Sequence, residues 1–178
     1  MDEKRLQKRY AQSLFDLARE KDIIDVIFND INNILEVCKD NRELNIVLKN
    51  PTVKPLKKKE ILFALFENSC NELTMRFLAL ITAKRREIYL KEICEEFIEI
   101  FNAYNNIKVV RITSATKLSE ETLNTIKQKI EAEYSCKVQT EEKINESLIG
   151  GFIIEIDDKQ YDASYLRKLN DLRKEIIK

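Results

Sequence analysis

The 178-residue sequence has no histidine and no tryptophan, and only two glycines and two prolines. Without histidine, the commonest general base and the usual Ser or Cys triads are unavailable, so an enzyme is the weakest class of function for this chain. The glycines are adjacent, at Gly150 and Gly151, which excludes a GxGxxG loop, and no GxxxxGK[ST] motif occurs. We therefore expect no catalytic residue, no cofactor and no metal site.

The sequence is also poor in cysteine patterns and in long apolar runs. Its four cysteines, Cys38, Cys70, Cys94 and Cys136, lie far apart and form no CxxC pair, so neither a zinc site nor a disulfide framework is predicted. Cys38 and Cys94 fall on or beside apolar helical faces, which favours packed thiols over a nucleophile. No run of eighteen apolar residues occurs, so we expect no direct insertion into a membrane.

Charge of one sign does not dominate, because 31 Lys and Arg residues balance 31 Asp and Glu residues. A net charge of zero offers no general attraction to nucleic acid or anionic lipid. The basic runs Lys57–Lys59 and Lys84–Arg86 lack interleaved aromatic residues. We interpret both runs as solvated surface, with phosphate binding as the less favoured alternative.

What the sequence has in quantity is helical periodicity. Apolar residues recur at spacings of three and four through the first 105 residues, which is typical of helices with one buried face. The pattern predicts six helices, near residues 6–18, 23–38, 42–50, 56–66, 73–81 and 88–104. Asn41 is the expected cap of the third helix, and Pro51 is expected to end it. Brief connections between such helices indicate a compact bundle.

The pattern changes after residue 105. The β-branched stretch 107–113 predicts a strand, and Ser119 is the expected N-cap of a helix that reaches Tyr134. Alternation around 136–138 and 152–156 predicts two further strands, followed by an exit turn at 157–159 and an amphipathic helix from Ser164. The predicted fold is mainly α, with a six-helix bundle over residues 1–105 and a small α/β domain over residues 106–178.

Four blocks of sequence carry a more specific signal. They are Arg9–Ala18, Leu48–Pro51 with Lys57–Leu62, Phe77–Arg86, and Ile144–Ile156 followed by Tyr161–Ser164 and Leu166–Leu169. In order and spacing they resemble the delta subunit family of F-type ATP synthases, which includes the mitochondrial oligomycin-sensitivity-conferring protein. Three departures are small: Ser13 and Ala163 replace an alanine and a glycine of the family pattern, and Lys84-Arg85 replaces Asn-Gly.

The resemblance implies a non-catalytic peripheral-stalk subunit that holds the catalytic head still while the rotor turns. It implies a groove between the first and fifth helices that takes an N-terminal helix of an alpha subunit. The matching positions are Tyr10, Ser13, Leu14 and Leu17 on one wall and Phe77, Leu80, Ile81 and Lys84 on the other, with Ile27 and Ile31 expected close by. For Leu14, Leu17 and Phe77, packing inside the bundle is an equally weighted alternative.

The same resemblance implies that the last helix contacts the b subunits of the stalk, through Leu166, Leu169, Leu172 and Ile176. The expected location is the cytoplasmic face of a bacterial plasma membrane, because no Arg-rich transit segment precedes Tyr10. The alternative class is a helical adaptor or a nucleic-acid-binding module, which would require a continuous basic face that the sequence does not display. We expect no nucleic acid among the partners.

Overall fold

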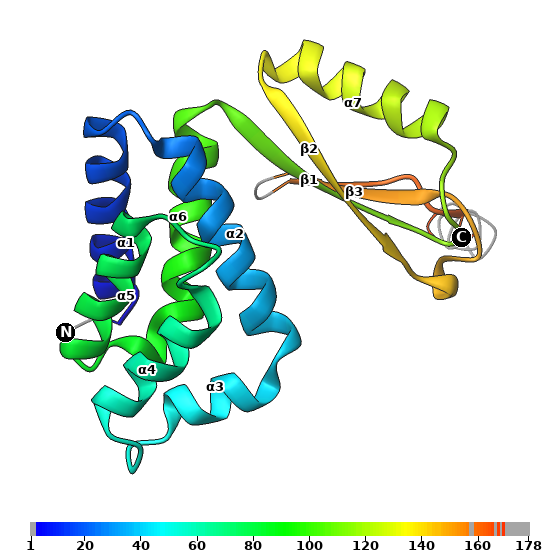
Figure 1. Ribbon diagram of the computed structural model, residues 1–178. Helices are drawn as coiled ribbons and strands as arrows, with labels where there is room; N and C mark the ends of the chain where they lie inside the picture. The colour runs from blue at the N-terminus through cyan, green and yellow to red at the C-terminus, as the bar shows by residue number, and fades with distance from the viewer. Residues whose placement is uncertain (1–2, 157–158, 166, 168, 170–178) are drawn as a thin grey trace. The chain divides into compact units, whose positions relative to one another are not determined.

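The computed structural model describes residues 3–156, 159–165, 167 and 169, and this part of the chain is mainly helical with a small sheet (Figure 1). The chain divides into two compact units, Met1–Phe101 and Asn102–Lys178. The elements are α1 (Glu3–Glu20), α2 (Ile24–Asp40), α3 (Arg42–Lys49), α4 (Pro55–Phe66), α5 (Glu72–Ala83), the 3-10 helix η1 (Glu87–Tyr89), α6 (Leu90–Tyr104), β1 (Ile107–Ser114), α7 (Glu120–Tyr134), β2 (Lys137–Ile144), the 3-10 helix η2 (Glu146–Leu148), β3 (Phe152–Ile156) and β4 (Lys159–Asp162).

The core of the first unit gathers on α6. Its buried residues follow the three- and four-residue spacing of one helical face: Leu90, Ile93, Cys94, Phe97 and Phe101. The ring of Phe15 from α1 lies 5.9 Å from that of Phe97, and Phe28 from α2 stacks on Phe101 at 3.9 Å. Because aromatic pairs combine a large buried area with a preferred geometry, these contacts fix α1 and α2 against α6.

Local sequence explains where the helices of this unit begin and end. Pro55 occupies the first turn of α4, where its missing N–H has no cost. Asn71 caps α5 by accepting the backbone N–H of Leu73 at 3.0 Å. Asn41 occupies the N-cap position of α3, as predicted, but its side chain makes no capping hydrogen bond to α3: its amide donates to Val37 O at 3.1 Å at the end of α2. The side chain therefore completes the preceding helix instead.

Two polar contacts are buried inside the first unit. Asp30 of α2 accepts the Asn71 backbone N–H and the Thr74 hydroxyl, both at 2.7 Å. The Lys58 ammonium lies 2.8 Å from Glu87 Oε1 and donates to Leu48 O at 2.6 Å, with side-chain exposures of 4% for Lys58 and 3% for Glu87. The burial of Lys58 corrects the prediction that the basic run Lys57–Lys59 is solvated surface. Lys58 is buried because α3, α4 and η1 meet around its ammonium group.

The second unit contains a four-stranded sheet of order β2-β1-β3-β4. β1 pairs with β2 in parallel and with β3 antiparallel, and β3 pairs with β4 antiparallel. Parallel neighbours need a crossover connection, and α7 provides it. Its predicted N-cap is confirmed, since Ser119 Oγ accepts the Thr122 N–H at 3.3 Å.

The strands bury alternate residues on the face that α7 covers. This core consists of Val110, Ile112, Ile126, Ile130, Cys136, Val138 and Ile156. The opposite face carries Arg111, which lies 3.5 Å from Glu141 Oε2 of β2 and 3.6 Å from Glu155 Oε2 of β3. The face beneath α7 therefore holds the apolar core, while the opposite face holds this charged cluster beside Val109 and Ile153, as the two-residue period of a strand dictates.

The sheet differs from the prediction in two ways. β2 extends to Ile144, well beyond the short alternating stretch in the sequence, because the whole strand pairs with β1. β4 was not predicted. Lys159 is its first residue, whereas we predicted that Lys159 belongs to a turn. β4 has four residues and lies at one edge of the sheet. An edge strand has a neighbour on one side only, so its sequence need not alternate between apolar and polar residues as an inner strand does.

Candidate partner-binding site

The nine residues predicted to line a groove divide into two groups. Leu14, Ile27, Phe77 and Ile81 are buried in the core of the first unit. Packing is therefore what these four side chains do in this structure, as the alternative interpretation of Leu14 and Phe77 proposed. The structure brings them together as core, because each falls on the inward stripe of its helix.

The other five side chains reach the surface of α1 and α5. Leu17 is 44% exposed and Leu80 is 47% exposed, which is high for large apolar side chains. Ser13 and Lys84 are exposed and Tyr10 is half-buried. The Ser13 hydroxyl donates to Arg9 O at 2.9 Å, so its polar group is satisfied within α1. Ser13 therefore offers a small surface that a partner can approach closely.

A cavity of about 590 Å³ lies along α1. The residues that line it are Arg5, Leu6, Lys8, Arg9, Gln12 and Ser13. Of the predicted groove residues, Ser13 alone is among them. Arg5, Lys8 and Arg9 were not among the predicted site residues, although their spacing of i, i+3 and i+4, at the start of the predicted helix and just before it, was a visible signal.

The other flank of α1 has the opposite electrostatic character. A cavity of about 400 Å³ is lined there by Glu3, Lys4, Gln7, Glu92, Glu95, Glu96 and Glu99, which come from α1 and α6. α1 thus separates a basic surface from an acidic one. A charged partner would meet opposite forces on the two sides of this helix.

The cysteines of the first unit lack the properties of nucleophiles. Burial raises the pKa of Cys38 to about 11, and burial likewise raises the pKa of Cys94 well above its usual value. A thiol must ionise to attack or to bind a metal, and both environments oppose ionisation. Among the residues that the structure describes, no three His, Cys, Asp or Glu side chains are placed to hold a metal ion.

The glycine pair of the second unit holds the start of the last segment close to β3. Gly151 has a φ of 78°, in the left-handed region, and a Cβ there would overlap the backbone of Ala163 and Ser164. A Cβ on Gly150 would overlap the Tyr165 ring. Backbone bonds of 3.0 Å join Ala163 N to Phe152 O and Tyr165 N to Gly150 O. Close packing against backbone and the left-handed φ therefore require glycine at 151, whereas a side chain at 150 would have to displace the exposed Tyr165 ring.

Asp162 and Ser164 organise the turn into the final segment. The Asp162 Oδ1 atom accepts the Ser164 backbone N–H at 2.9 Å, and Ser164 Oγ accepts the Arg167 N–H at 3.2 Å. Hydrogen bonds from the Ser164 side chain and backbone lower the pKa of Asp162 below its ordinary value of 3.8. Asp162 and Ser164 thus cap the start of the final segment, a role that Asp and Ser side chains often have.

Apolar side chains are exposed around this turn. Ile149 and Tyr165 are both exposed, and Leu169 is 54% exposed. Ile149 has a φ of 64°, unusual for a β-branched residue. Of the predicted b-subunit contacts, Leu169 alone is described, while Leu166, Leu172 and Ile176 lie outside the described residues.

Comparison with known proteins reveals full-length relatives. Residues 6–176 match the family described as ATP synthase delta (OSCP) subunit. The chain is 39% identical over 173 residues to "ATP synthase subunit delta" of Cytophaga hutchinsonii, covering 97% of this chain and 94% of the relative. It is 37% identical over 169 residues to the protein of the same name from Carboxydothermus hydrogenoformans, covering 95% of each.

The chain belongs to the ATP synthase delta (OSCP) subunit family. It is therefore a structural, non-catalytic component of the ATP synthase peripheral stalk, and the family predicted from the four sequence blocks is confirmed. In the described residues, no helix is both long enough and apolar enough to cross a membrane.

A solved structure contains a chain of the same fold. The chain aligns with a chain of the Toxoplasma gondii mitochondrial ATP synthase hexamer with a TM-score of 0.76 at 17% identity. The alignment covers 97% of this chain and 98% of the other. The match supports a mainly helical fold with a small sheet.

Proposed function

We propose that this subunit joins the catalytic head of an ATP synthase to the b subunits of the stalk, so that the head does not turn with the rotor. In this proposal the six helices α1–α6 act as one bundle that binds an N-terminal helix of the alpha subunit. The second unit contacts the b subunits through its final segment. The assembly works on the cytoplasmic face of a bacterial plasma membrane.

The observation that carries the proposal is the exposure of Leu17 and Leu80, at 44% and 47%. They lie on α1 and α5, the two helices that the family resemblance assigns to the groove. A helix bound in a groove depends on a few apolar anchors, and such anchors must be accessible before the partner arrives. Ser13 adds a small residue that allows close approach on the α1 side.

The proposal for the second unit rests on its exposed apolar side chains. Ile149, Tyr165 and Leu169 surround the turn that Asp162 and Ser164 organise. Exposed apolar groups beside an ordered turn are a common feature of protein interfaces. Leu166, Leu172 and Ile176 complete the proposed contact with the b subunits.

The groove is tested by calorimetric titration of the purified subunit with a synthetic peptide of the N-terminal helix of the alpha subunit from the same genome. We expect one-to-one binding that weakens by at least about tenfold in Leu17→Ala/Leu80→Ala. Both positions are exposed, so the variant should keep its fold, which circular dichroism will check.

A matched control is Ile46→Ala/Leu56→Ala, which removes two exposed apolar side chains from α3 and α4. This variant should bind the peptide as the unaltered protein does. If the helical peptide does not bind the unaltered protein, or if both double variants weaken binding equally, the groove proposal is wrong.

A further inference from the structure

The cavity along α1 is rich in cations. Arg5, Lys8 and Arg9 line it, and all three side chains are exposed. Within the described part of the chain, none of them forms an ion pair, whereas Arg19, further along α1, pairs with Asp16 at 4.0 Å. The chain as a whole carries no net charge, so this concentration of charge is local.

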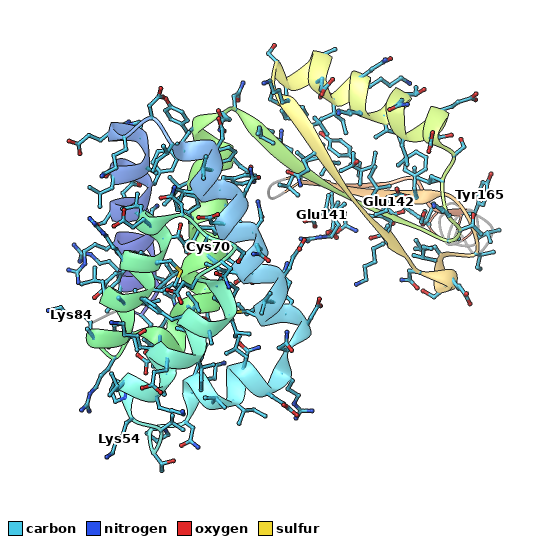
Figure 2. The ribbon with its side chains drawn as sticks, viewed as in Figure 1. Lys54, Cys70, Lys84, Glu141, Glu142 and Tyr165 are labelled. Atoms are coloured by element: carbon cyan, nitrogen blue, oxygen red, sulfur yellow. The ribbon has the colours of Figure 1, made fainter. Side chains whose placement is uncertain are left out.

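A second group of cations lies at the same end of the first unit. Lys84, Arg85 and Arg86 form the connection between α5 and η1, and Figure 2 labels Lys84 at the end of α5. The Tyr89 hydroxyl donates to Glu3 Oε1 at 2.8 Å, so η1 is held against the first turn of α1.

The basic surface of Arg5, Lys8 and Arg9 on one side of α1 borders an acidic surface on the other side. On the other flank of α1, five glutamates of α1 and α6 line the acidic cavity. An acidic ligand is therefore attracted to one side of α1 and repelled from the other. This segregation defines both where such a ligand binds and how it is oriented.

We propose that the helix that binds along α1 is acidic on one face, with carboxylates directed to Arg5, Lys8 and Arg9 and apolar residues directed to the Leu17 and Leu80 side. This inference rests on the proposed function and adds the charge of the partner to it. Arginine holds a carboxylate through two parallel N–H bonds, so Arg5 and Arg9 set the register of the bound helix.

The lining of the cavity favours a peptide over nucleic acid. None of the residues that line the cavity is aromatic, so bases would find no stacking platform, while Leu17 on the same helix supplies an exposed apolar side chain. An amphipathic helix uses both the cations and the apolar surface, whereas a phosphate backbone uses the cations alone.

The test compares two peptides on the unaltered protein. One is the N-terminal helix of the cognate alpha subunit, and the other carries Asn and Gln in place of its Asp and Glu residues. We expect the neutral peptide to bind at least about tenfold more weakly at about 0.02 M salt, and the difference to shrink at about 0.3 M salt, where exposed charges are screened. Circular dichroism verifies that both peptides reach the same helicity.

Charge reversal on the protein provides the reciprocal measurement. Arg5→Glu/Arg9→Glu should weaken binding of the acidic peptide by at least about tenfold at low salt and leave binding of the neutral peptide nearly unchanged. The matched control is Lys39→Glu/Arg42→Glu, the same change of charge at exposed positions of α2 and α3. It should alter both affinities by less than about twofold.

The outcomes separate this inference from the proposed function. If both peptides bind equally and Arg5→Glu/Arg9→Glu behaves like the control, the charge of the partner is irrelevant and the inference is overturned, while the groove proposal stands. A cognate helix without a carboxylate-bearing face overturns it equally. If a single-stranded oligonucleotide binds more tightly than the acidic peptide and depends on Arg5 and Arg9, the ligand is a nucleic acid instead. If neither peptide binds the unaltered protein, the proposed function itself is wrong.

Discussion

The two units of the molecule place charge in opposite ways. The first buries an ion pair, Lys58 with Glu87, where three elements meet around the Lys58 ammonium. The second keeps its cross-strand charges, centred on Arg111, on the exposed face of the sheet. A buried charge is costly unless every partner is present, whereas an exposed one is largely solvated. The first unit therefore depends more strongly on its ion pair than the second depends on its exposed charges.

The cores of the two units are also built differently. The first unit surrounds α6 with aromatic contacts from α1 and α2. The second buries one sheet face beneath α7, and its order near the end of the chain depends on two glycines and the Asp162–Ser164 turn. The five substitutions below test this difference, beginning with the largest expected effect.

Breaking the buried ion pair should be the most damaging change. Lys58→Ala leaves the Glu87 carboxylate buried without its cation, and we expect the first unit to lose about 3–5 kcal/mol of unfolding free energy. Urea denaturation followed by circular dichroism measures the loss. The paired replacement Lys58→Met/Glu87→Leu should recover most of it, because no buried charge then remains. A double variant as unstable as Lys58→Ala would contradict this account.

The next largest effect is expected at Gly151. An alanine there must adopt a left-handed φ and displace the backbone of Ala163, so Gly151→Ala should destabilise the second unit by about 1–3 kcal/mol. Amide hydrogen exchange can report this unit separately from the first. Unchanged protection in β3 and β4 would show that the chain accommodates the methyl group without strain.

Removal of the α7 cap should have a smaller effect. Ser119→Ala deletes the acceptor for the Thr122 N–H, at an expected cost of about 1 kcal/mol. Ser119→Asp restores an acceptor and should retain stability. Equal losses in both variants, measured by urea denaturation, would mean that another feature of Ser119 matters.

The exposed charges of the second unit should matter less still. Arg111 lies on the open sheet face with two carboxylates, and Arg111→Ala should change the unfolding free energy by less than about 1 kcal/mol. High salt should make the difference in unfolding free energy between Arg111→Ala and the unaltered protein smaller still. A loss comparable to that of Lys58→Ala would remove the contrast between the two units.

The smallest effect should be visible only as a pH dependence. The pKa of Asp162 is lower in the folded chain than in the unfolded chain, so its stabilisation is present above about pH 4 and is lost as the pH falls through the folded value. Asp162→Asn should remove this acid-side dependence from the second unit. Parallel pH profiles for the variant and the unaltered protein, measured by hydrogen exchange between about pH 3 and pH 6, would contradict the assignment.

Patterns of neighbouring residues were readable from the sequence alone. Helical periodicity located the helices of the first unit, β-branched and alternating stretches located three strands, and Ser119 was identified as a cap. The four ordered blocks identified the family. The secondary-structure features depend on residues a few positions apart, and the family assignment depends on the order and spacing of four short blocks, so both can be read along the sequence.

Tertiary structure decided what local patterns could not. Lys58 belongs to a basic run, yet Leu48 and Glu87, distant in sequence, create a buried site for it. The edge strand β4 forms because β3 offers it hydrogen-bond partners. Phe77 and Leu80 lie one turn apart on α5, and only the position of the neighbouring helices makes Phe77 core and Leu80 surface. Burial and long-range pairing arise from contacts between distant segments, which periodicity along one segment does not contain.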